Sequence, residues 1–234
     1  MNDKPVIHLG GTILVPDPSG ALWWPETATL IVADLHLEKG ASFARAGSLL
    51  PPYDTRTTLN RLADRIADLV PTRIVALGDS FHRADSADFL DEADAELLAS
   101  LTAKAEWFWL AGNHDPQPPA SRLGGAVVTG DWRLGPLMLR HEAVMGCADD
   151  AEISGHYHPK ARLRLHGRSA SYRCFVADAR RLVLPAFGAY AGGLEVSDLA
   201  LRTLFGQGFT AYLVGRRKVT AVPHHLLLPE LLPA

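Results

Sequence analysis

The sequence predicts an α/β fold in which two mixed β-sheets pack face to face between outer helices, an αββα sandwich, with residues 1–234 forming one domain. In the first half, short apolar runs alternate with helical patterns, which is typical of parallel strands joined by crossover helices. From Ala126 onward the pattern changes to short strands and tight turns, which indicates a second, mixed or antiparallel sheet. A chain that is 47% hydrophobic can bury a core of this size.

The elements of the first half follow from local patterns. "TILVP" and "ALWWP" flank the turn "DPSG" and predict an opening hairpin. Helical spacing of apolar residues predicts a helix over "RTTLNRLADRIADLV", with Asp54 as its N-cap, and a second helix over "FLDEADAELLASLTAK". Three apolar runs predict the parallel strands between them: "ATLIVADLHL", "RIVALGD" and "EWFWLAGN".

Charge and cysteine content narrow the class of protein. The net charge of -3 gives no overall basic surface for nucleic acid. The acidic run over 85–96 is interpreted as a solvated face, whereas the basic run over 160–181 follows a candidate site and fits either phosphate contact or solvation. Cys147 and Cys174 lack metal or disulfide spacing, and neither a signal peptide nor a bilayer-length apolar run is found, so we expect a cytoplasmic protein without membrane contact.

Polar side chains stand at the carboxyl end of each predicted parallel strand. Asp34 and His36 lie at the end of the first strand, Asp79 lies at the end of the second strand, and Asn113 lies at the end of the third. These ends of parallel strands meet in one crevice, where ligands bind. Residues two apart in an extended segment share a face, so Asp34 and His36 point the same way.

Three later histidines complete a metal-binding pattern. Imidazole, carboxylate and amide oxygen together suit manganese, iron or zinc better than calcium. Seven ligands are too many for one tetrahedral ion but fit two ions sharing a carboxylate, the arrangement used for in-line phosphoryl displacement. The candidate ligands are Asp34, His36, Asp79, Asn113, His141, His156 and His158. His8, His166, His224 and His225 are interpreted as ordinary core or surface residues.

The motifs "DLH", "GD", "GNHD", a later His and "GHYH" resemble the calcineurin-like metallophosphoesterases, in order and over nearly the whole chain. The resemblance implies the two-sheet sandwich and two divalent metal ions, for which we expect Mn²⁺, with Fe, Zn or Mg as alternatives. It also implies that Asp79 bridges the two ions. One ion would be held by Asp34, His36, Asp79 and His158, and the other by Asp79, Asn113, His141 and His156.

The resemblance also suggests catalytic residues. His114 would stabilise the transition state or protonate the leaving oxygen, and His82 is the second candidate for that role. Asp115 would hold His114 in its productive tautomer. At His82, in "GDSFH", the sequence departs from the phosphatase branch and resembles double-strand-break repair nucleases, which shifts the expected substrate from phosphomonoesters to phosphodiesters.

Two further stretches, "EKGASFARAGSLLPPYDTRTTL" and "LPAFGAYAGGLEV", are similar to bacterial ligase-associated DNA-damage-response metallophosphoesterases. This implies a DNA endonuclease or phosphodiesterase in repair, with single-stranded DNA as the favoured substrate. It also implies functional association with a DNA ligase, a helicase and an exonuclease. Both stretches also have a structural interpretation, as a helix start and as a loop passing over the core. The alternatives are a phosphodiesterase or pyrophosphatase acting on a small nucleotide and a non-catalytic scaffold of the same fold.

Overall fold

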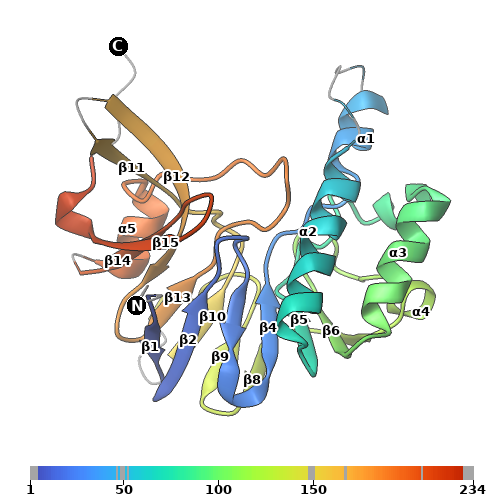
Figure 1. The fold of residues 1–234 in the computed structure, drawn as a ribbon, viewed down its shortest axis with the longest axis horizontal. Helices are drawn as coiled ribbons and strands as arrows, with labels where there is room; N and C mark the ends of the chain where they lie inside the picture. The colour runs from blue at the N-terminus through green and yellow to red at the C-terminus, as the bar shows by residue number, and fades with distance from the viewer. Residues whose placement is uncertain are drawn as a thin grey trace.

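The computed structural model describes residues 5–45, 47, 51, 53–146, 151–165, 168–206 and 208–228. Its strands form two sheets (Figure 1). The first sheet holds, in spatial and chain order, β1 (Ile7–Leu9), β2 (Thr12–Pro16), β3 (Leu22–Trp24), β4 (Thr29–Val32), β5 (Arg73–Ala76), β6 (Glu106–Leu110) and β7 (Ala126–Val128). The second follows the order β15 (Val219–Pro223), β14 (Thr210–Val214), β12 (Arg168–Ala177), β13 (Arg181–Val183), β10 (Ala151–Ser154), β9 (Leu137–Leu139) and β8 (Trp132–Leu134), while β11 (Lys160–Leu165) pairs with β12.

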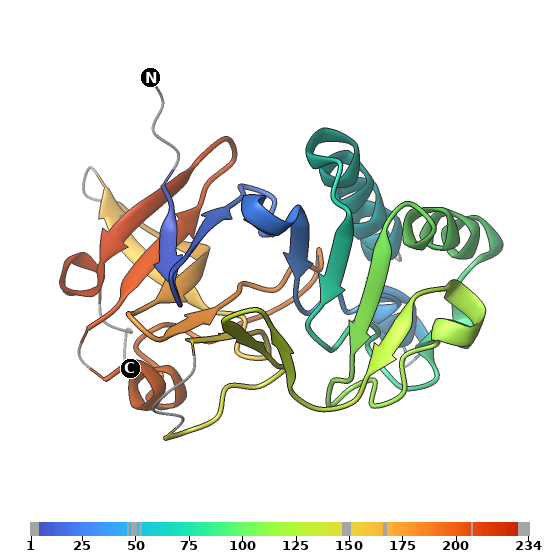
Figure 2. The ribbon, with the colours of Figure 1, turned by 90° about the horizontal axis from the view of Figure 1, so that it is seen from below.

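The helices lie outside the sheets. They are α1 (Lys39–Arg45), α2 (Asp54–Leu69), α3 (Glu92–Thr102), α4 (Ala120–Leu123) and α5 (Leu199–Phe205), with 3₁₀ turns η1 (Pro25–Thr27), η2 (Ser86–Phe89) and η3 (His224–Leu226). Figures 1 and 2 show α2 and α3 together on one side of the molecule, opposite the strands β14 and β15. Among the described residues, no helix combines the length and apolar character needed to cross a bilayer.

Parallel pairing places the ends of three strands side by side. β4, β5, β6 and β7 pair in parallel, and α2, α3 and α4 form the connections between them. Such strands are covered on both faces, so every residue of β4 is buried. Leu30 packs toward the helices with Leu62 of α2, and its neighbour Ile31 packs between the sheets with Ile153. The alternation fixes the register, and with it the position of the loop that follows β4.

The fold class predicted from the sequence is confirmed, with two local corrections. The opening hairpin is present as β2 and β3, but β7 belongs to the first sheet, so the second sheet begins at β8 rather than at Ala126. Asp54 is the first residue of α2 rather than its N-cap. Its carboxylate accepts a hydrogen bond from the backbone N–H of Gly40 at 3.0 Å, which ties α1 to α2.

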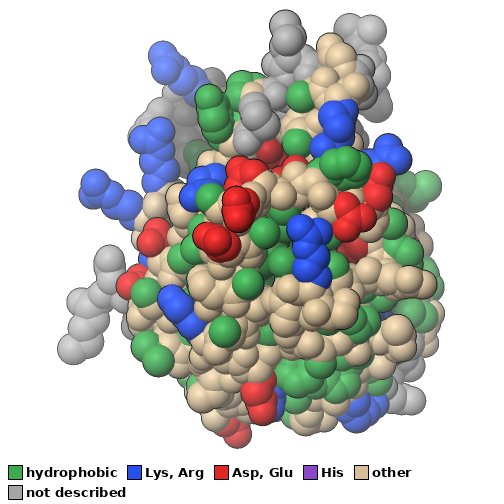
Figure 3. Space-filling view, turned by 90° about the vertical axis from the view of Figure 1, so that its right-hand side faces the viewer, with side chains coloured by type: hydrophobic (Ala, Val, Ile, Leu, Met, Phe, Trp, Pro, Cys, Tyr) green, Lys and Arg blue, Asp and Glu red, His purple; other side chains and the backbone are tan. Residues whose placement is uncertain are grey.

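Most acids of the run over 85–96 are exposed, in agreement with a solvated face, whereas Asp94 is buried and contacts Arg56. Asp85 contacts Arg83 at 3.2 Å, and Asp88 contacts Arg122 at 3.4 Å. The side of the molecule shown in Figure 3 accordingly carries acidic and basic side chains interspersed rather than a field of one sign. Pairs this exposed contribute little to stability, so the run carries no functional inference. Cys147 lies outside the described residues, and Cys174 is a buried free thiol.

Candidate metal centre

The loops that follow β4 and β5 run beside each other and are hydrogen-bonded. The backbone N–H of Asp34 donates to the carbonyl oxygen of Gly78 at 3.3 Å, and that of His36 donates to the carbonyl oxygen of Asp79 at 3.0 Å. The side chains of Asp34, His36 and Asp79 are each at most 5% exposed. The sheet therefore delivers two carboxylates and an imidazole to one place, as the convergence of parallel strand ends predicts.

Many of the candidate ligands adopt an unusual backbone conformation. Of the seven, five have a positive φ, between 44° and 69°: Asp34, His36, Asp79, His156 and His158. This left-handed region is sparsely populated by residues other than glycine and costs on the order of 1–3 kcal/mol per residue. Such strain gathers at functional sites, where it turns a side chain toward a ligand instead of the core. Its concentration on these residues sets them apart from ordinary loop residues.

A first group of potential ligand atoms consists of Asp34, His36 and His158. The Nε2 atom of His158 lies 3.3 Å from Oδ1 of Asp34 and 3.2 Å from Nε2 of His36. The other oxygen of Asp34 accepts a hydrogen bond from the backbone N–H of His156 at 2.9 Å, which fixes the carboxylate. Burial, followed by the neighbouring His158, lowers the pKa of His36 to about 3, so His36 is neutral and available as a ligand.

A second group consists of Asp79, His141 and His156, with Asn113 among them. The Oδ1 atom of Asn113 lies 2.8 Å from Nε2 of His141 and 3.0 Å from Nδ1 of His156. The Nδ1 atom of His141 donates to the carbonyl oxygen of Leu77 at 2.9 Å, so the Nε2 lone pair of the neutral ring faces the oxygens of Asn113 and Asp79.

The second group requires a positive charge among its ligand atoms. Two lone-pair atoms at hydrogen-bond distance repel unless a proton or a metal ion lies between them. Burial lowers the pKa of His141, but the hydrogen bond to Asp79 and the charges of Asp34 and Asp79 outweigh it and raise that pKa to about 9. The same negative potential favours a divalent cation. The donor set of imidazole, carboxylate and amide oxygen fits manganese, iron or zinc.

Asp79 contacts residues on both sides of the site. Its Oδ1 accepts the backbone N–H of His114 at 2.8 Å, and its Oδ2 lies 3.4 Å from Nε2 of His141. Burial would raise the pKa of Asp79, but the hydrogen bond and charge of His141, together with the N–H of His114, lower it to about 2. The carboxylate is therefore ionised throughout the physiological range.

His114 lies beside these groups and is oriented by a backbone carbonyl. Its Nδ1 donates to the carbonyl oxygen of His82 at 2.8 Å, which leaves the Nε2 end, 3.9 Å from Oδ2 of Asp79, directed at the centre. The carboxylate of Asp115 instead accepts the backbone N–H groups of Ser80 and Phe81 at 2.9 and 3.1 Å. The orienting contact therefore comes from His82, where the sequence suggested Asp115.

Asp115 has a different role from the one that the sequence suggested, and Glu142 is a residue that sequence reasoning missed. Burial, and then the nearby Asp79, raise the pKa of Asp115 to about 7 although two backbone N–H groups favour its ionised form. Its contacts hold the loop after β5 in place. Glu142 follows His141 directly and places a carboxylate oxygen 3.7 Å from Nε2 of His156. A carboxylate on the far nitrogen is the usual way to orient a ligating histidine. The signal was present as "RHE", but a lone acid after a histidine is too common to single out.

Glycines in the motifs allow the close approach of these loops. A Cβ atom on Gly112 would lie 2.2 Å from the backbone nitrogen of Asp79, and one on Gly193 would lie 2.0 Å from the carbonyl oxygen of His158. Neither position can hold a side chain unless the ligand loop moves. The Gly-rich loop "GAYAGG" therefore packs against a candidate ligand segment instead of merely passing over the core.

Adjacent glycines of this loop provide a matched pair of variants. Gly193→Ala is expected to displace His158, lower stability by about 1–3 kcal/mol and weaken metal binding. Gly192→Ala meets no atom within 4 Å and serves as the control. Chemical denaturation and metal titration of both variants measure the effect. Equal behaviour of the two would show that the contact with His158 is unimportant.

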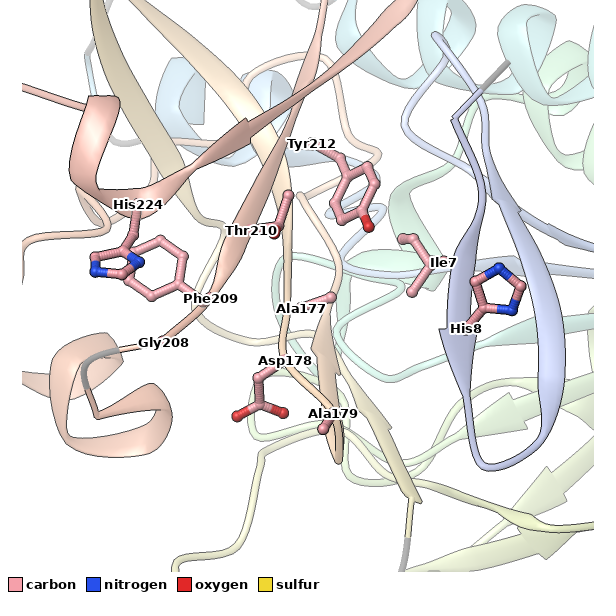
Figure 4. A pocket seen from close by; sticks show the side chains of 10 residues that line it. All are labelled: Ile7, His8, Ala177, Asp178, Ala179, Gly208, Phe209, Thr210, Tyr212 and His224. Atoms are coloured by element: carbon pink, nitrogen blue, oxygen red, sulfur yellow. The ribbon is translucent and has the colours of Figure 1, made fainter. Parts of the chain in front are cut away.

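A separate surface pocket contains none of the candidate ligands. It is lined by residues that include His8, Asp178, Tyr212 and His224, whose side chains do not converge (Figure 4). The carboxylate of Asp178 accepts the backbone N–H groups of Arg180 and Arg181, which accounts for its position in a turn. His8 and His224 fall outside the potential metal groups found among the described residues, in agreement with their ordinary role. His166 lies outside the described residues.

The fold and this site define a hydrolase family. A family model described as calcineurin-like phosphoesterase matches residues 27–185, which contain all seven candidate ligands. The chain therefore belongs to the calcineurin-like phosphoesterases and is a metal-dependent phosphoesterase. A comparison with curated protein sequences gave no match.

Two solved structures are similar to the chain. The Pseudomonas putida nuclease MPE is 29% identical, with a TM-score of 0.72 over 94% of this chain and 100% of that chain. Yfce, a phosphoesterase from E. coli, is 15% identical, with a TM-score of 0.44 over 83% of this chain and 97% of that chain.

Proposed function

We propose that the protein is a dinuclear-metal phosphodiesterase that cleaves single-stranded DNA. The observation that carries the metal site is the pair of ligand groups described above, with Asp79 in the second group and its charge acting on His36 of the first. One ion would be held by Asp34, His36, Asp79 and His158, and the other by Asp79, Asn113, His141 and His156. Bound divalent ions supply a nucleophilic hydroxide at neutral pH and neutralise charge on the attacked phosphate. The family resemblance favours Mn²⁺, and the mixed nitrogen and oxygen donors would suit manganese, iron or zinc.

His114 is the proposed general acid. The carbonyl oxygen of His82 holds the proton on Nδ1, so Nε2 is the atom that exchanges a proton with the leaving oxygen. The exposed ring is 5.6 Å from the ring of His82 and nearly parallel to it. His82 is the alternative acid. Burial, and then the charge of Lys39, lower the pKa of His82, which reduces the fraction of its ring that carries a proton to donate at neutral pH.

Two observations support DNA as the substrate. The first is the similarity in structure to the Pseudomonas putida nuclease. The second is the basic run over 160–181, in which two arginines make contacts within the fold and others lie on the surface. Arg173 donates to the carbonyl oxygen of Ala186 at 2.7 Å, and buried Arg181 contacts Glu152 at 2.7 Å. The association with a DNA ligase, a helicase and an exonuclease stays a prediction of the family resemblance.

Three further cations of the run lie in a row on β11, of which Arg162 is half-buried and 3.9 Å from a carboxylate oxygen of Glu195. Lys160, Arg162 and Arg164 alternate along β11, so they share one face. The strand begins two residues after His158, and consecutive cations on one face are about 7 Å apart. A row of charges that starts beside the metal centre is suited to an extended polyanion.

Salt dependence tests this row. Arg164→Ala is expected to reduce the dependence of log K on log salt by about 0.7 for single-stranded DNA, since one phosphate contact is lost. Arg216→Ala, an exposed arginine in the turn between β14 and β15, is the matched control. DNA affinity is measured by fluorescence anisotropy between about 50 and 200 mM salt, a range over which each phosphate contact contributes its own increment to the slope. If log K depends on log salt with the same slope for both variants, Arg164 makes no phosphate contact.

The direct test of function uses circular single-stranded DNA. Protein stripped with chelator and reloaded with Mn²⁺ is expected to linearise the circles, which only an internal cut can do. Products are followed on a denaturing gel with and without metal. If the circles stay intact but a small phosphodiester is hydrolysed, the metal centre is catalytic and the substrate is a small nucleotide. Inactivity on both, despite bound metal, would favour the non-catalytic scaffold.

A further inference from the structure

A stack of three rings extends outward from the metal centre. The ring of His114 lies 5.6 Å from that of His82 with an interplanar angle of 23°, and the ring of Phe43 lies 5.7 Å from His82 with an angle of 27°. Both contacts are stacked. Phe43 belongs to α1, which stands at the end of α2 beyond the sheets (Figure 1).

Phe43 is exposed although it is a large apolar residue. Its relative exposure is 39%, while His82 covers one side of the ring. An aromatic face left open beside a phosphoesterase centre can accept a flat, apolar part of the substrate.

A cation lies one helical turn before this ring. Lys39 and Phe43 are four residues apart on α1 and therefore share a face of the helix. Lys39 is half-buried and close enough to the centre for its charge to act on both His36 and His82. The pair thus combines a positive charge with an aromatic surface, the two features that proteins use to bind single-stranded nucleic acid.

We propose that Phe43 stacks on a base of the DNA strand next to the scissile phosphate, and that Lys39 contacts a phosphate of the same strand. This inference rests on the proposed function and adds to it a positioning element for the nucleotide. Because Phe43 is itself stacked on His82, the position of the base along the stack is set relative to His114. A strand held in this way presents its phosphate at one position, which accounts for an exposed phenylalanine at this point.

The test is a position-resolved cleavage assay. An end-labelled thymidine oligonucleotide carries one abasic residue, and cleavage at each linkage is read on a sequencing gel. The wild-type enzyme is expected to cut a linkage beside the abasic residue about 5- to 150-fold more slowly than distant linkages of the same strand, the range that corresponds to loss of one stacked base. Phe43→Leu is expected to cut all linkages alike, and Phe43→Tyr is expected to restore the difference.

Phe89→Leu is the matched control. Phe89 is also an exposed phenylalanine, at 49%, but Arg45 lies over its ring, 4.1 Å from the centroid. This variant is expected to keep the difference between linkages.

Three results would overturn the inference. If the wild-type enzyme cuts beside the abasic residue as fast as elsewhere, no base stacks at that position. If Phe43→Leu still cuts that linkage more slowly than the others, the base stacks on another residue. If the enzyme hydrolyses small phosphodiesters but not DNA, then DNA is not the substrate and the stacking of a DNA base on Phe43 is excluded as well. The first two results leave the DNA endonuclease activity intact, so the two failures are distinguishable.

Discussion

Replacement of Asp79 by alanine is expected to abolish metal binding at one or both positions and to lower DNA cleavage by about 10³-fold or more, because the metal ions supply several kcal/mol of transition-state stabilisation. Its carboxylate lies 3.4 Å from Nε2 of His141 and accepts the N–H of His114. Loss of that acceptor leaves a backbone N–H unpaired and costs about 1–3 kcal/mol of stability. Metal content and cleavage rate are measured on the same preparations.

Two further variants separate chemistry from folding. Asp79→Asn keeps an oxygen for the N–H of His114 but removes the charge, so it is expected to fold normally and still lose metal. Asp85→Ala removes an exposed carboxylate of the following segment, which contacts Arg83 at 3.2 Å, and is expected to retain both metal and activity. An Asp79→Asn protein with full metal content and wild-type turnover would exclude Asp79 as the shared ligand.

Replacement of His114 by alanine is expected to retain the metal ions and to lower turnover on DNA by about 10²–10⁴-fold, the usual contribution of a general acid. The loss should be much smaller on a p-nitrophenyl phosphodiester, because nitrophenolate leaves without a proton. Steady-state rates on both substrates measure the difference. The structure supports this assignment through the Nδ1 contact to the carbonyl oxygen of His82, which frees Nε2 for the substrate.

His82→Ala distinguishes the two candidate acids. If His114 is the acid, removal of the His82 side chain is expected to have the smaller effect, since the orienting carbonyl oxygen belongs to the backbone. Equal losses on DNA and on the nitrophenyl ester for His114→Ala would contradict the acid role and leave charge stabilisation as its function. If His82→Ala instead loses more turnover than His114→Ala, and loses it on DNA but not on the nitrophenyl ester, His82 is the general acid.

Periodicity and strand ends made much of the fold predictable. Alternation of Leu30 and Ile31 between two apolar layers, and helical spacing through Leu62, are local patterns that burial enforces. The pairing of β7 with β6 was not predictable, because "AVV" is too short to carry a sheet preference and its partner is chosen by the crossover through α4. The contact of Asp54 with Gly40 was missed for a similar reason: a cap and a tertiary hydrogen bond use the same residue type.

The candidate ligands were predictable where polar residues recur at the ends of successive strands. Residues such as Asp34, Asp79 and Asn113 end successive strands, so their convergence follows from topology. The orientation of His114 by a carbonyl oxygen leaves no trace in the sequence, since any residue at position 82 could offer one. The stack on Phe43 depends likewise on where α1 lies, which no local pattern specifies.

Anomalous diffraction from crystals loaded with manganese would show whether the two ligand groups hold two ions. We expect two peaks per chain, about 3.5–4 Å apart, with Asp79 beside both and the two histidine groups on either side. A single peak, or two peaks that do not share Asp79, would contradict a dinuclear centre built from these residues.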